Sequence, residues 1–451
     1  MNESLFKQQL RGLERYFFRC PNSNLVMVVK VKGTVSSEQL KAALSKLIKK
    51  YPLLRVKVSL DDNNIAWLTS DGVPENPVYE ELRAADDTEA WIRKVSEEQR
   101  ARFQLDKGPL VRFRLLSSPE GSELIINCHH AICDALSLTY LARDILFSVA
   151  NPECTLEQAV SVTDTQKTRL PSSRFFDLHQ RIFMKALNVL WRRNGISFSE
   201  ADYQALHRKY WDKGKGNHTL SWGLTESQTS AFVNRCHKER VTVHSAIATA
   251  VVAAQRDVQG TRPAYLSNVS MPVDIRKRMS PPIGEAFGMY VSTVKADLSY
   301  AMETGFWPNV RRIHQRIKRR LTNSSVFLIP HKVNLVHPSL LDAVYFSKYG
   351  LLNSKIAAFI LRMTGISRMN IGWEISNLGR CDLPVNYGSL RLESIVVPVY
   401  LSDYQAKCLR IVTVGGRMFF SFTFWEDLMD TFTAEKIRDT SMRYLSEATC
   451  W

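Results

Sequence analysis

The sequence lacks the patterns that mark membrane-spanning, secreted, fibrous or repetitive chains. No run of about 18 uncharged apolar residues occurs in its 451 residues, so we expect no membrane-spanning helix. The opening residues, MNESLFKQQLRG, do not follow the basic and then apolar order of a secretory signal. No repeat of about 20–50 residues is visible, which argues against a solenoid or a propeller. With 20 glycines and 17 prolines, the chain is also too poor in both for a collagen-like or low-complexity protein.

Paired cysteines are absent as well. The eight cysteines are scattered and form no CxxC pair, so they indicate neither a disulfide framework nor a zinc site. We interpret them as reduced, mostly buried thiols and expect a cytoplasmic protein without a metal centre.

Acidic residues are in deficit: 44 Asp and Glu stand against 60 Lys and Arg, a net charge of +16. Such an excess favours an anionic partner, whether nucleic acid, an anionic membrane or a phosphorylated cofactor. No helix-turn-helix, zinc or RNP-like pattern occurs, so we do not expect nucleic acid binding. The most basic run, 310–321, is typical of an amphipathic helix whose charged face meets solvent.

Hydrophobic periodicity predicts two mixed αβ halves of similar size. In the first half, alternating or continuous apolar runs predict strands, and apolar residues at helical spacing predict helices. We expect strands at 24–32, 54–60, 111–116 and 123–128, and helices at 6–17, 36–49, 88–103 and 135–147. Ser36 or Ser37 would cap the second of these helices.

An irregular stretch, 150–217, separates this half from the next. We expect an N-terminal lobe at 1–170, a crossover or linker at 171–217 and a C-terminal lobe at 218–451. In the second half we expect strands at 218–223, 264–272, 291–298, 370–376, 390–400, 408–414 and 417–425, and helices at 225–237, 242–256 and 433–445. Thr433 is the expected cap of the last helix.

Two adjacent histidines carry the strongest chemical signal. His129 and His130 end an apolar strand, and Asp134 follows through a turn. Neighbouring side chains on a strand point to opposite faces, so one imidazole should face the core and the other an open side. A histidine held in one tautomer is what a general base near neutral pH requires. By itself such a pair more often marks satisfied core histidines than a catalytic site.

The residues around this pair resemble the HHxxxDG superfamily in order and spacing. That superfamily includes condensation domains of nonribosomal peptide synthetases, polyketide-associated acyltransferases, wax ester synthases and alcohol acetyltransferases. The matching positions are Phe103, Leu105, Gly108, Pro109, Leu110, Arg112, His129, His130, Asp134, Ala135 and Ser137. One departure is Ala135, which stands where the family has glycine.

Further segments resemble the same superfamily from about residue 10 to 446. They read GLERYFF, AALSKLIKKYPLLRV, VTVHSAIATA, MPVDIRKRM, IGEAFGMYVSTV and EISNLGR. A DFGWG segment is missing, which argues against the plant-type branch. No LGGxS-like carrier segment occurs, so we expect no tethered donor on this chain.

The resemblance implies two chloramphenicol-acetyltransferase-like α+β lobes that form a pseudo-dimer, with a tunnel at their interface. His130 would be the general base that activates an acceptor for direct attack on an acyl thioester, without an acyl-enzyme. Asp134 would support it by pairing with Arg276, or alternatively with Arg278, and His129 and Ala135 would support the motif. As residues of the channel or of an oxyanion site, we expect Ser137, Asn377 and Gly379.

From this resemblance we expect an acyltransferase (EC 2.3.1) that moves an acyl group from acyl-CoA to an alcohol, with acyl-CoA as co-substrate and no bound cofactor. One alternative is a stand-alone condensation enzyme that forms an amide or ester from a donor on a separate carrier protein. Another is an inactive binding protein that keeps the fold. We expect a monomer.

Two apolar stretches leave their roles open. The segment 174–193 combines aromatic and basic residues, so it could lie on a membrane surface, cover the acyl channel or pack on the second lobe. The segment 340–361 could flank a lipophilic substrate or form an ordinary buried helix pair. Peripheral membrane contact therefore stays open.

Overall fold

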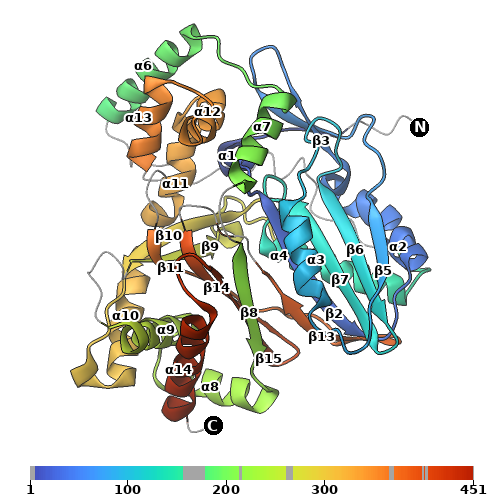
Figure 1. Cartoon of the computed structure of the whole chain (residues 1–451), viewed down its shortest axis with the longest axis vertical. Coiled ribbons are helices and arrows are strands. Elements are labelled where there is room, and N and C mark those ends of the chain that lie inside the picture. Colours follow the sequence, from blue (N-terminus) through green and yellow to red (C-terminus); the bar gives the residue numbers. More distant parts are fainter. Residues whose placement is uncertain are drawn as a thin grey trace.

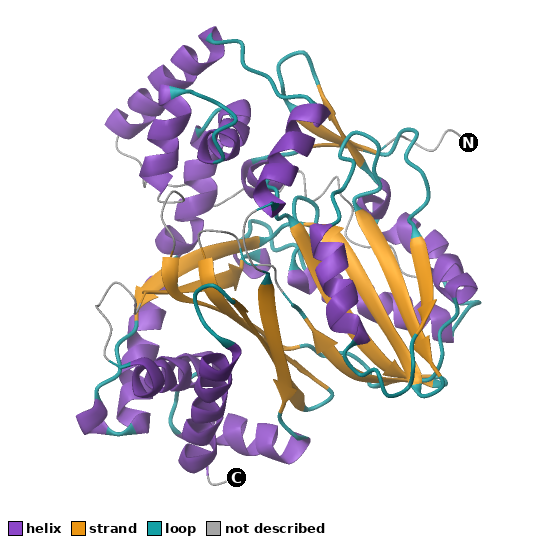
Figure 2. Ribbon diagram, viewed as in Figure 1, coloured by secondary structure: helices purple, strands orange, loops and turns teal. Residues whose placement is uncertain are grey.

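The computed structural model in Figure 1 contains two six-stranded sheets, a layer of helices and a small three-stranded sheet with the order β1 (Lys7–Gln9), β4 (Ala66–Thr69) and β3 (Lys57–Leu60). It describes residues 6–155, 178–212, 216–260, 268–364, 370–398, 401 and 405–449. Figure 2 shows the strands in the middle of the molecule, with helices on the outer faces of both sheets. The expected mixed α+β class with two lobes is confirmed.

The first sheet has the strand order β12-β13-β2-β7-β6-β5. Its bounds are β12 Asn386–Tyr387, β13 Leu390–Val396, β2 Asn24–Lys32, β7 Gly121–His129, β6 Val111–Ser118 and β5 Val78–Leu82. Helices α2 (Ser37–Lys50) and α4 (Ala135–Ala150) cover one face, and α3 (Ala90–Arg100) covers the other. Alternate residues of β2 supply the two cores: Met27 and Val29 face one, Val26 and Val28 the other.

The second sheet has the order β10-β9-β11-β14-β15-β8. Its bounds are β10 Val291–Asp297, β9 Asn268–Asp274, β11 Asn370–Arg380, β14 Gln405–Val414, β15 Arg417–Trp425 and β8 Asn217–Gly223. The helices that build its core are α8 (Glu226–Lys238), α9 (Val243–Gln259), α10 (Phe306–Arg320) and α14 (Thr431–Thr449). Short 3-10 turns, η3 (Arg276–Arg278) and η4 (Met302–Thr304), connect its elements.

A layer of helices lies across one end of both sheets (Figure 1). It consists of α1 (Gly12–Phe17), α6 (Leu178–Arg193), α7 (Glu200–Trp211), α11 (Asn323–Leu335), α12 (Pro338–Lys348) and α13 (Lys355–Thr364). Buried Asp342 of α12 ties the layer together, because it accepts hydrogen bonds from Arg15 (Nη2–Oδ2, 2.6 Å) and Arg19 (3.1 Å). Within the described residues, no helix is both long and apolar enough to cross a membrane.

The sequence-based lobe boundaries differ from this arrangement in two places. Strands β12 and β13 fall inside the expected C-terminal lobe, 218–451, but complete the first sheet, where Leu392 pairs with Val31 and Val396 with Val28. Helices α12 and α13 likewise pack into the first core. Apolar faces determine these positions, and a face can be buried by either half of the chain.

The expected linker, 171–217, is also more than a connection. Its described part contains α6 and α7, whose Trp191, Tyr203 and Leu206 are buried in the first core. Residues 171–177 and 213–215 lie outside the described residues, as do 156–170 of the expected N-terminal lobe. Aromatic and aliphatic residues at helical spacing explain why this stretch folds onto a lobe.

Smaller differences concern element ends. The segment expected as one helix at 6–17 is strand β1 (Lys7–Gln9) followed by α1, and β1 pairs with β4 (Ala66–Thr69). The strand expected at 54–60 is the 3-10 turn η1 (Pro52–Arg55) followed by β3 (Lys57–Leu60). Thr433 does not cap the last helix, because α14 begins earlier and Asp430 accepts from the Thr433 N–H at 2.8 Å. Strand β2 and the Ser36 cap of α2 are as expected.

Candidate active site

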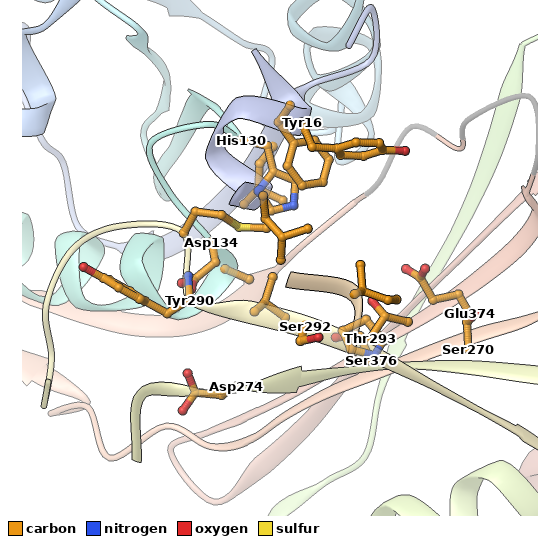
Figure 3. A pocket seen from close by; sticks show the side chains of 18 of the residues that line it. Tyr16, His130, Asp134, Ser270, Asp274, Tyr290, Ser292, Thr293, Glu374 and Ser376 are labelled. Atoms are coloured by element: carbon orange, nitrogen blue, oxygen red, sulfur yellow. The ribbon is translucent and has the colours of Figure 1, made fainter. Parts of the chain in front are cut away.

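A cavity of about 890 Å³ lies between the two sheets and the helical layer. The first lobe contributes His130 and Ala135, and α1 contributes Tyr16 and Phe17. Strands β9, β10, β11 and β14 line the opposite side. Figure 3 labels Ser270, Asp274, Ser292, Thr293, Glu374 and Ser376 on this side. The other polar side chains of these strands that border the cavity are Lys295, Asn377, Gln405 and Arg410. The histidine therefore faces a wall made by the other lobe.

His130 is held in place on three sides. It directly follows β7, and its backbone N–H donates to Ser23 O at 2.7 Å. Its ring stacks on Phe17, with centroids 4.3 Å apart, and its Nδ1 lies 2.7 Å from Cys133 O. The imidazole thus has one orientation, and it borders the cavity.

The Cys133 contact fixes the tautomer of His130. A carbonyl oxygen only accepts hydrogen bonds, so Nδ1 must carry the proton and Nε2 keeps its lone pair. Burial lowers the pKa of His130, while the Cys133 carbonyl and Asp134 oppose that shift and Arg410 adds to it. The neutral ring is the form that can accept a proton.

His129 faces the core instead. Its side chain is 1% exposed, and its Nδ1 accepts from the Ala131 N–H at 3.2 Å. Burial lowers its pKa to about 3, with smaller contributions from His130 and Arg112, so the ring is neutral. It packs edge-to-face against Phe103 at 5.9 Å. The two histidines therefore occupy opposite sides of the strand end.

Asp134 contacts the second lobe and caps α4. Its carboxylate accepts from both terminal nitrogens of Arg276, at 2.8 and 2.9 Å, and from the Ser137 N–H at 2.9 Å. The Tyr290 N–H donates to it as well, at 2.9 Å. Burial would raise the pKa of Asp134, but Arg276 and these donors lower it below its usual value. The bidentate pair joins the turn after His130 to η3 of the other lobe.

The alternative partner, Arg278, points elsewhere. Its Nη1 donates to Leu321 O at 3.0 Å and to Asn323 Oδ1 at 2.8 Å. Arg276, by contrast, is buried and also donates to Ser137 Oγ at 2.8 Å and to Asp274 Oδ1 at 2.9 Å. Of the two candidates, only Arg276 is joined to Asp134.

Ser137 is a correction to the expected channel residues. It is fully buried and does not border the cavity. Its hydroxyl donates to Gly288 O at 2.9 Å and accepts from the Gly288 N–H at 3.0 Å. The side chain sits in the first turn of α4, which faces the partner lobe rather than the substrate space. Its hydrogen bonds hold the two lobes together.

Ala135 fills the motif glycine position without strain. It is the first residue of α4, directly after the cap Asp134, and its φ is not positive. Helical dihedrals suit alanine better than glycine, which loses more conformational entropy on folding. The local backbone therefore does not require glycine here.

Asn377 borders the cavity, whereas Gly379 does not. Asn377 Oδ1 accepts from the Gly379 N–H at 2.8 Å, in a bulge of β11 where Gly379 has φ +76°. Because the oxygen is used in this turn, the amide NH₂ group is the part of Asn377 left to donate. Gly379 acts by shaping the turn.

An acid–base pair in the cavity wall was missed by sequence reasoning. Glu374 of β11 and Arg410 of β14 both border the cavity and form an ion pair of 2.6 Å. Arg410 is the interaction that lowers the pKa of His130 further after burial. A charged residue inside the apolar strand CLRIVTV was the available signal.

Both apolar stretches with open roles border the cavity. From α6, His179, Phe183 and Met184 reach it, and from α12 and α13 Leu341 and Ile360 do. The segment 340–361 is thus a helix pair that lines the site, with α12 buried and α13 buried on one side only, at Ala357 and Ile360. Arg174 to Asp177 lie outside the described residues.

Two known families match parts of this chain. Residues 7–150 match the condensation domain family, and residues 217–328 match the family described as phthiocerol/phthiodiolone dimycocerosyl transferase C-terminus. A plipastatin synthase of Bacillus subtilis is 25% identical over 210 residues, 45% of this chain. The match spans 8% of that synthase's length.

Solved structures show the same fold at low identity. The trichothecene 15-O-acetyltransferase of Fusarium sporotrichioides is 12% identical, with a TM-score of 0.66 over 99% of this chain and 95% of that one. The first condensation domain of the CDA synthetase is 15% identical, with a TM-score of 0.63 over 99% and 97%.

Proposed function

We propose that this chain, whose residues 7–150 match the condensation domain family and whose residues 217–328 match an acyltransferase C-terminus, transfers an acyl group from acyl-CoA to an alcohol. The two family matches support acyl transfer in general. The choice of donor and acceptor, and the roles of the residues, are the proposal.

The observation that carries it is the fixed tautomer of His130. With Nδ1–H donating to Cys133 O, the basic Nε2 is free to take a proton from a hydroxyl bound in the cavity. The lowered pKa of His130, which burial causes, keeps this nitrogen unprotonated near neutral pH.

In the proposed reaction the acceptor oxygen attacks the thioester carbonyl carbon while His130 Nε2 takes the hydroxyl proton. The tetrahedral intermediate carries its negative charge on the former carbonyl oxygen, and the Asn377 amide is the proposed donor to it. The C–S bond then breaks, and the thiolate leaves with the proton from His130. Asp134 and Arg276 have the role of positioning the turn that carries the base, through their paired hydrogen bonds.

A donor bound to a carrier protein is the second candidate. It is favoured by the match of residues 7–150 to condensation domains and by similarity to peptide synthetases. The same His130 geometry serves an amine or hydroxyl acceptor in that case.

A thiol-release assay tests the proposal. Purified protein is given acetyl-CoA or longer acyl-CoA with a panel of alcohols, and in parallel an acyl carrier protein with amines and alcohols. We expect release of CoA thiol that depends on the alcohol and is lost in His130→Ala. Turnover only with the acyl carrier protein would favour the condensation enzyme, and tight acyl-CoA binding without turnover of any donor would favour an inactive binder.

A further inference from the structure

Helices α6 and α13 expose a continuous apolar surface beside the cavity, which we call the mouth surface. Its large side chains on α6 recur seven residues apart, Ile182 with Val189 and Phe183 with Leu190, and this spacing of about two helical turns places them on one face. Ile182 is 58% exposed, Leu190 51% and Met363 55%. The full set is Ile182, Phe183, Val189, Leu190, Phe359 and Met363.

One ring contact and a shared cavity border make this one surface rather than scattered side chains. Phe183 of α6 and Phe359 of α13 meet with ring centroids 5.8 Å apart, so the two helices are joined at their exposed faces. Figure 1 shows the pair at the outer end of the helical layer. Phe183 and Met363 also border the cavity. The mouth surface therefore continues directly into the lining of the active-site cavity.

The helices around the mouth surface carry a one-sided charge. Four of them, α6, α11, α12 and α13, contain eight basic residues and one acidic residue. The acidic residue, Asp342, is buried and paired with Arg15 and Arg19, so it does not offset the field outside. The basic residues are Arg181, Lys185, Arg192, Arg193, Lys332, Lys348, Lys355 and Arg362.

Helix α10 provides the contrast within the same chain. It is also basic, with exposed Arg319 and Arg320 near its end. None of the large exposed apolar side chains lies on it. Helix α10 thus combines basic residues with no large exposed apolar side chain, whereas the helices at the cavity mouth have both basic residues and exposed apolar side chains.

We propose that the mouth surface docks on an anionic lipid bilayer, with its apolar side chains in the interface and its basic side chains against lipid headgroups. Stable binding of a peripheral protein needs two such signals, because either one alone is weak. A large apolar surface without basic flanks would fit a protein partner equally well, and here the flanks have a single sign. With the mouth surface against the bilayer, the opening of the active-site cavity lies at the membrane surface.

The orientation also specifies the substrate class, and this step rests on the proposed acyl transfer. The helical layer lines the cavity with Met184, Ile329, Leu341, Val344 and Ile360. A lipophilic acceptor or acyl chain dissolved in the bilayer would enter past Phe183 and Met363 without crossing water. Soluble short substrates would not need the membrane.

Vesicle flotation tests the docking step without any turnover. The purified chain is mixed with vesicles of phosphatidylcholine alone or of phosphatidylcholine with phosphatidylglycerol. We expect binding to the anionic vesicles, weaker binding at high salt, and a drop of about tenfold or more in partitioning for Ile182→Ser/Leu190→Ser. The control Leu428→Ser/Phe432→Ser removes two exposed apolar side chains elsewhere and should bind like the parent.

Two matched charge-reversal variants distinguish the effect of basic residues at the mouth surface from the effect of the net charge of the whole chain. Lys185→Glu/Arg193→Glu and Arg319→Glu/Arg320→Glu change the net charge equally, but only the first pair lies at the mouth surface. We expect the first to lose binding by about tenfold or more and the second to keep most of it. Equal losses would assign binding to net charge and overturn the proposal.

Two further outcomes would also overturn it. No binding of the parent to anionic vesicles excludes the membrane, and a dimer in light scattering that Ile182→Ser/Leu190→Ser dissociates identifies a second copy as the occupant. Turnover of acetyl-CoA with a soluble alcohol should be unchanged in Ile182→Ser/Leu190→Ser. If that activity is absent in the parent too while binding persists, the proposed function fails and the docking surface stands.

Discussion

The molecule contains the same local arrangement twice, and only one copy holds the candidate base. In each lobe an antiparallel hairpin, β6–β7 or β14–β15, runs into a turn, an aspartate and a helix, α4 or α14. The aspartate follows the last strand residue at the same spacing in both. Asp134 accepts from the Ser137 N–H at 2.9 Å, and Asp430 accepts from the Thr433 N–H at 2.8 Å.

The two copies differ in what they face. Asp134 is buried against Arg276 of the other lobe, whereas Asp430 is exposed and has only the cap to make. The residue after the strand is His130 in the cavity in one case and exposed Glu426 in the other. Both lobes thus contain the same hairpin, turn and helix. Only in the first lobe does the other lobe supply a buried partner for the aspartate and a cavity beside the residue that follows the strand.

The largest expected effect separates the residues that follow the two strands. Replacing His130 with Ala should lower kcat/KM by about 10²–10⁴-fold, because the proton acceptor is lost. Glu426→Ala, the matched change in the other unit, should leave the rate unchanged. Thiol release and circular dichroism of both variants measure this, and a His130→Ala protein that turns over like the parent would remove the histidine from the mechanism.

The next effect concerns the buried ion pair. Asp134→Ala leaves the Arg276 guanidinium buried without its main partner, which should cost about 3–5 kcal/mol in the free energy of unfolding. Urea unfolding gives the value. Asp134→Ala/Arg276→Met should be less destabilised than Asp134→Ala, since no unpaired charge remains. If Asp134→Ala lost no more free energy of unfolding than the removal of an exposed helix cap, the Asp134–Arg276 pair would not be what holds the lobes together.

The exposed cap predicts a smaller change. Asp430→Ala removes the acceptor for the first turn of α14 but leaves no buried charge behind. We expect the Tm to fall by less than in Asp134→Ala and kcat to stay the same. Thermal unfolding of the two variants side by side checks this order. A fall in Tm for Asp430→Ala that equals or exceeds the fall for Asp134→Ala would mean that the helix cap, not the ion pair, contributes most of the stability.

The smallest effect is in the pH profile. Burial lowers the pKa of His130, so the unprotonated base persists below the usual 6.5 and is lost only as the pH falls through the lowered pKa. At pH 6.5 kcat/KM should therefore retain more than about half of its plateau value. An acid limb centred above 6.5 would mean that the ring is not buried as described.

Local sequence signals predicted much of the fold. Strand β2, the β6–β7 hairpin and helix α2 with its Ser36 cap match because alternation and capping depend on neighbouring residues. The start of α1 and the cap of α14 were wrong, since a strand partner and an earlier aspartate replaced the expected signals. Long-range choices, such as β13 joining the first sheet, left no local signal.

The candidate site likewise contains residues that the sequence motif predicted and residues that only the three-dimensional structure revealed. The motif pointed to His130, Asp134 and Arg276, and the lobes bring Asp134 and Arg276 together. It also suggested Ser137 as a channel residue, although that hydroxyl is used up by Gly288. The ion pair of Glu374 and Arg410 could not be predicted from the sequence, because strands β11 and β14 are neighbours in the sheet but far apart along the chain.

By itself the sequence determined the two αβ lobes, the strand that ends in two histidines, and the excess of positive charge. Period-two and helical patterns and a short motif are local, so they can be read along the chain. Only the tertiary structure decided which histidine faces the cavity, which arginine meets Asp134, and where basic and apolar side chains share a surface. Those outcomes depend on side chains from distant segments being buried against one another, and no single segment encodes that.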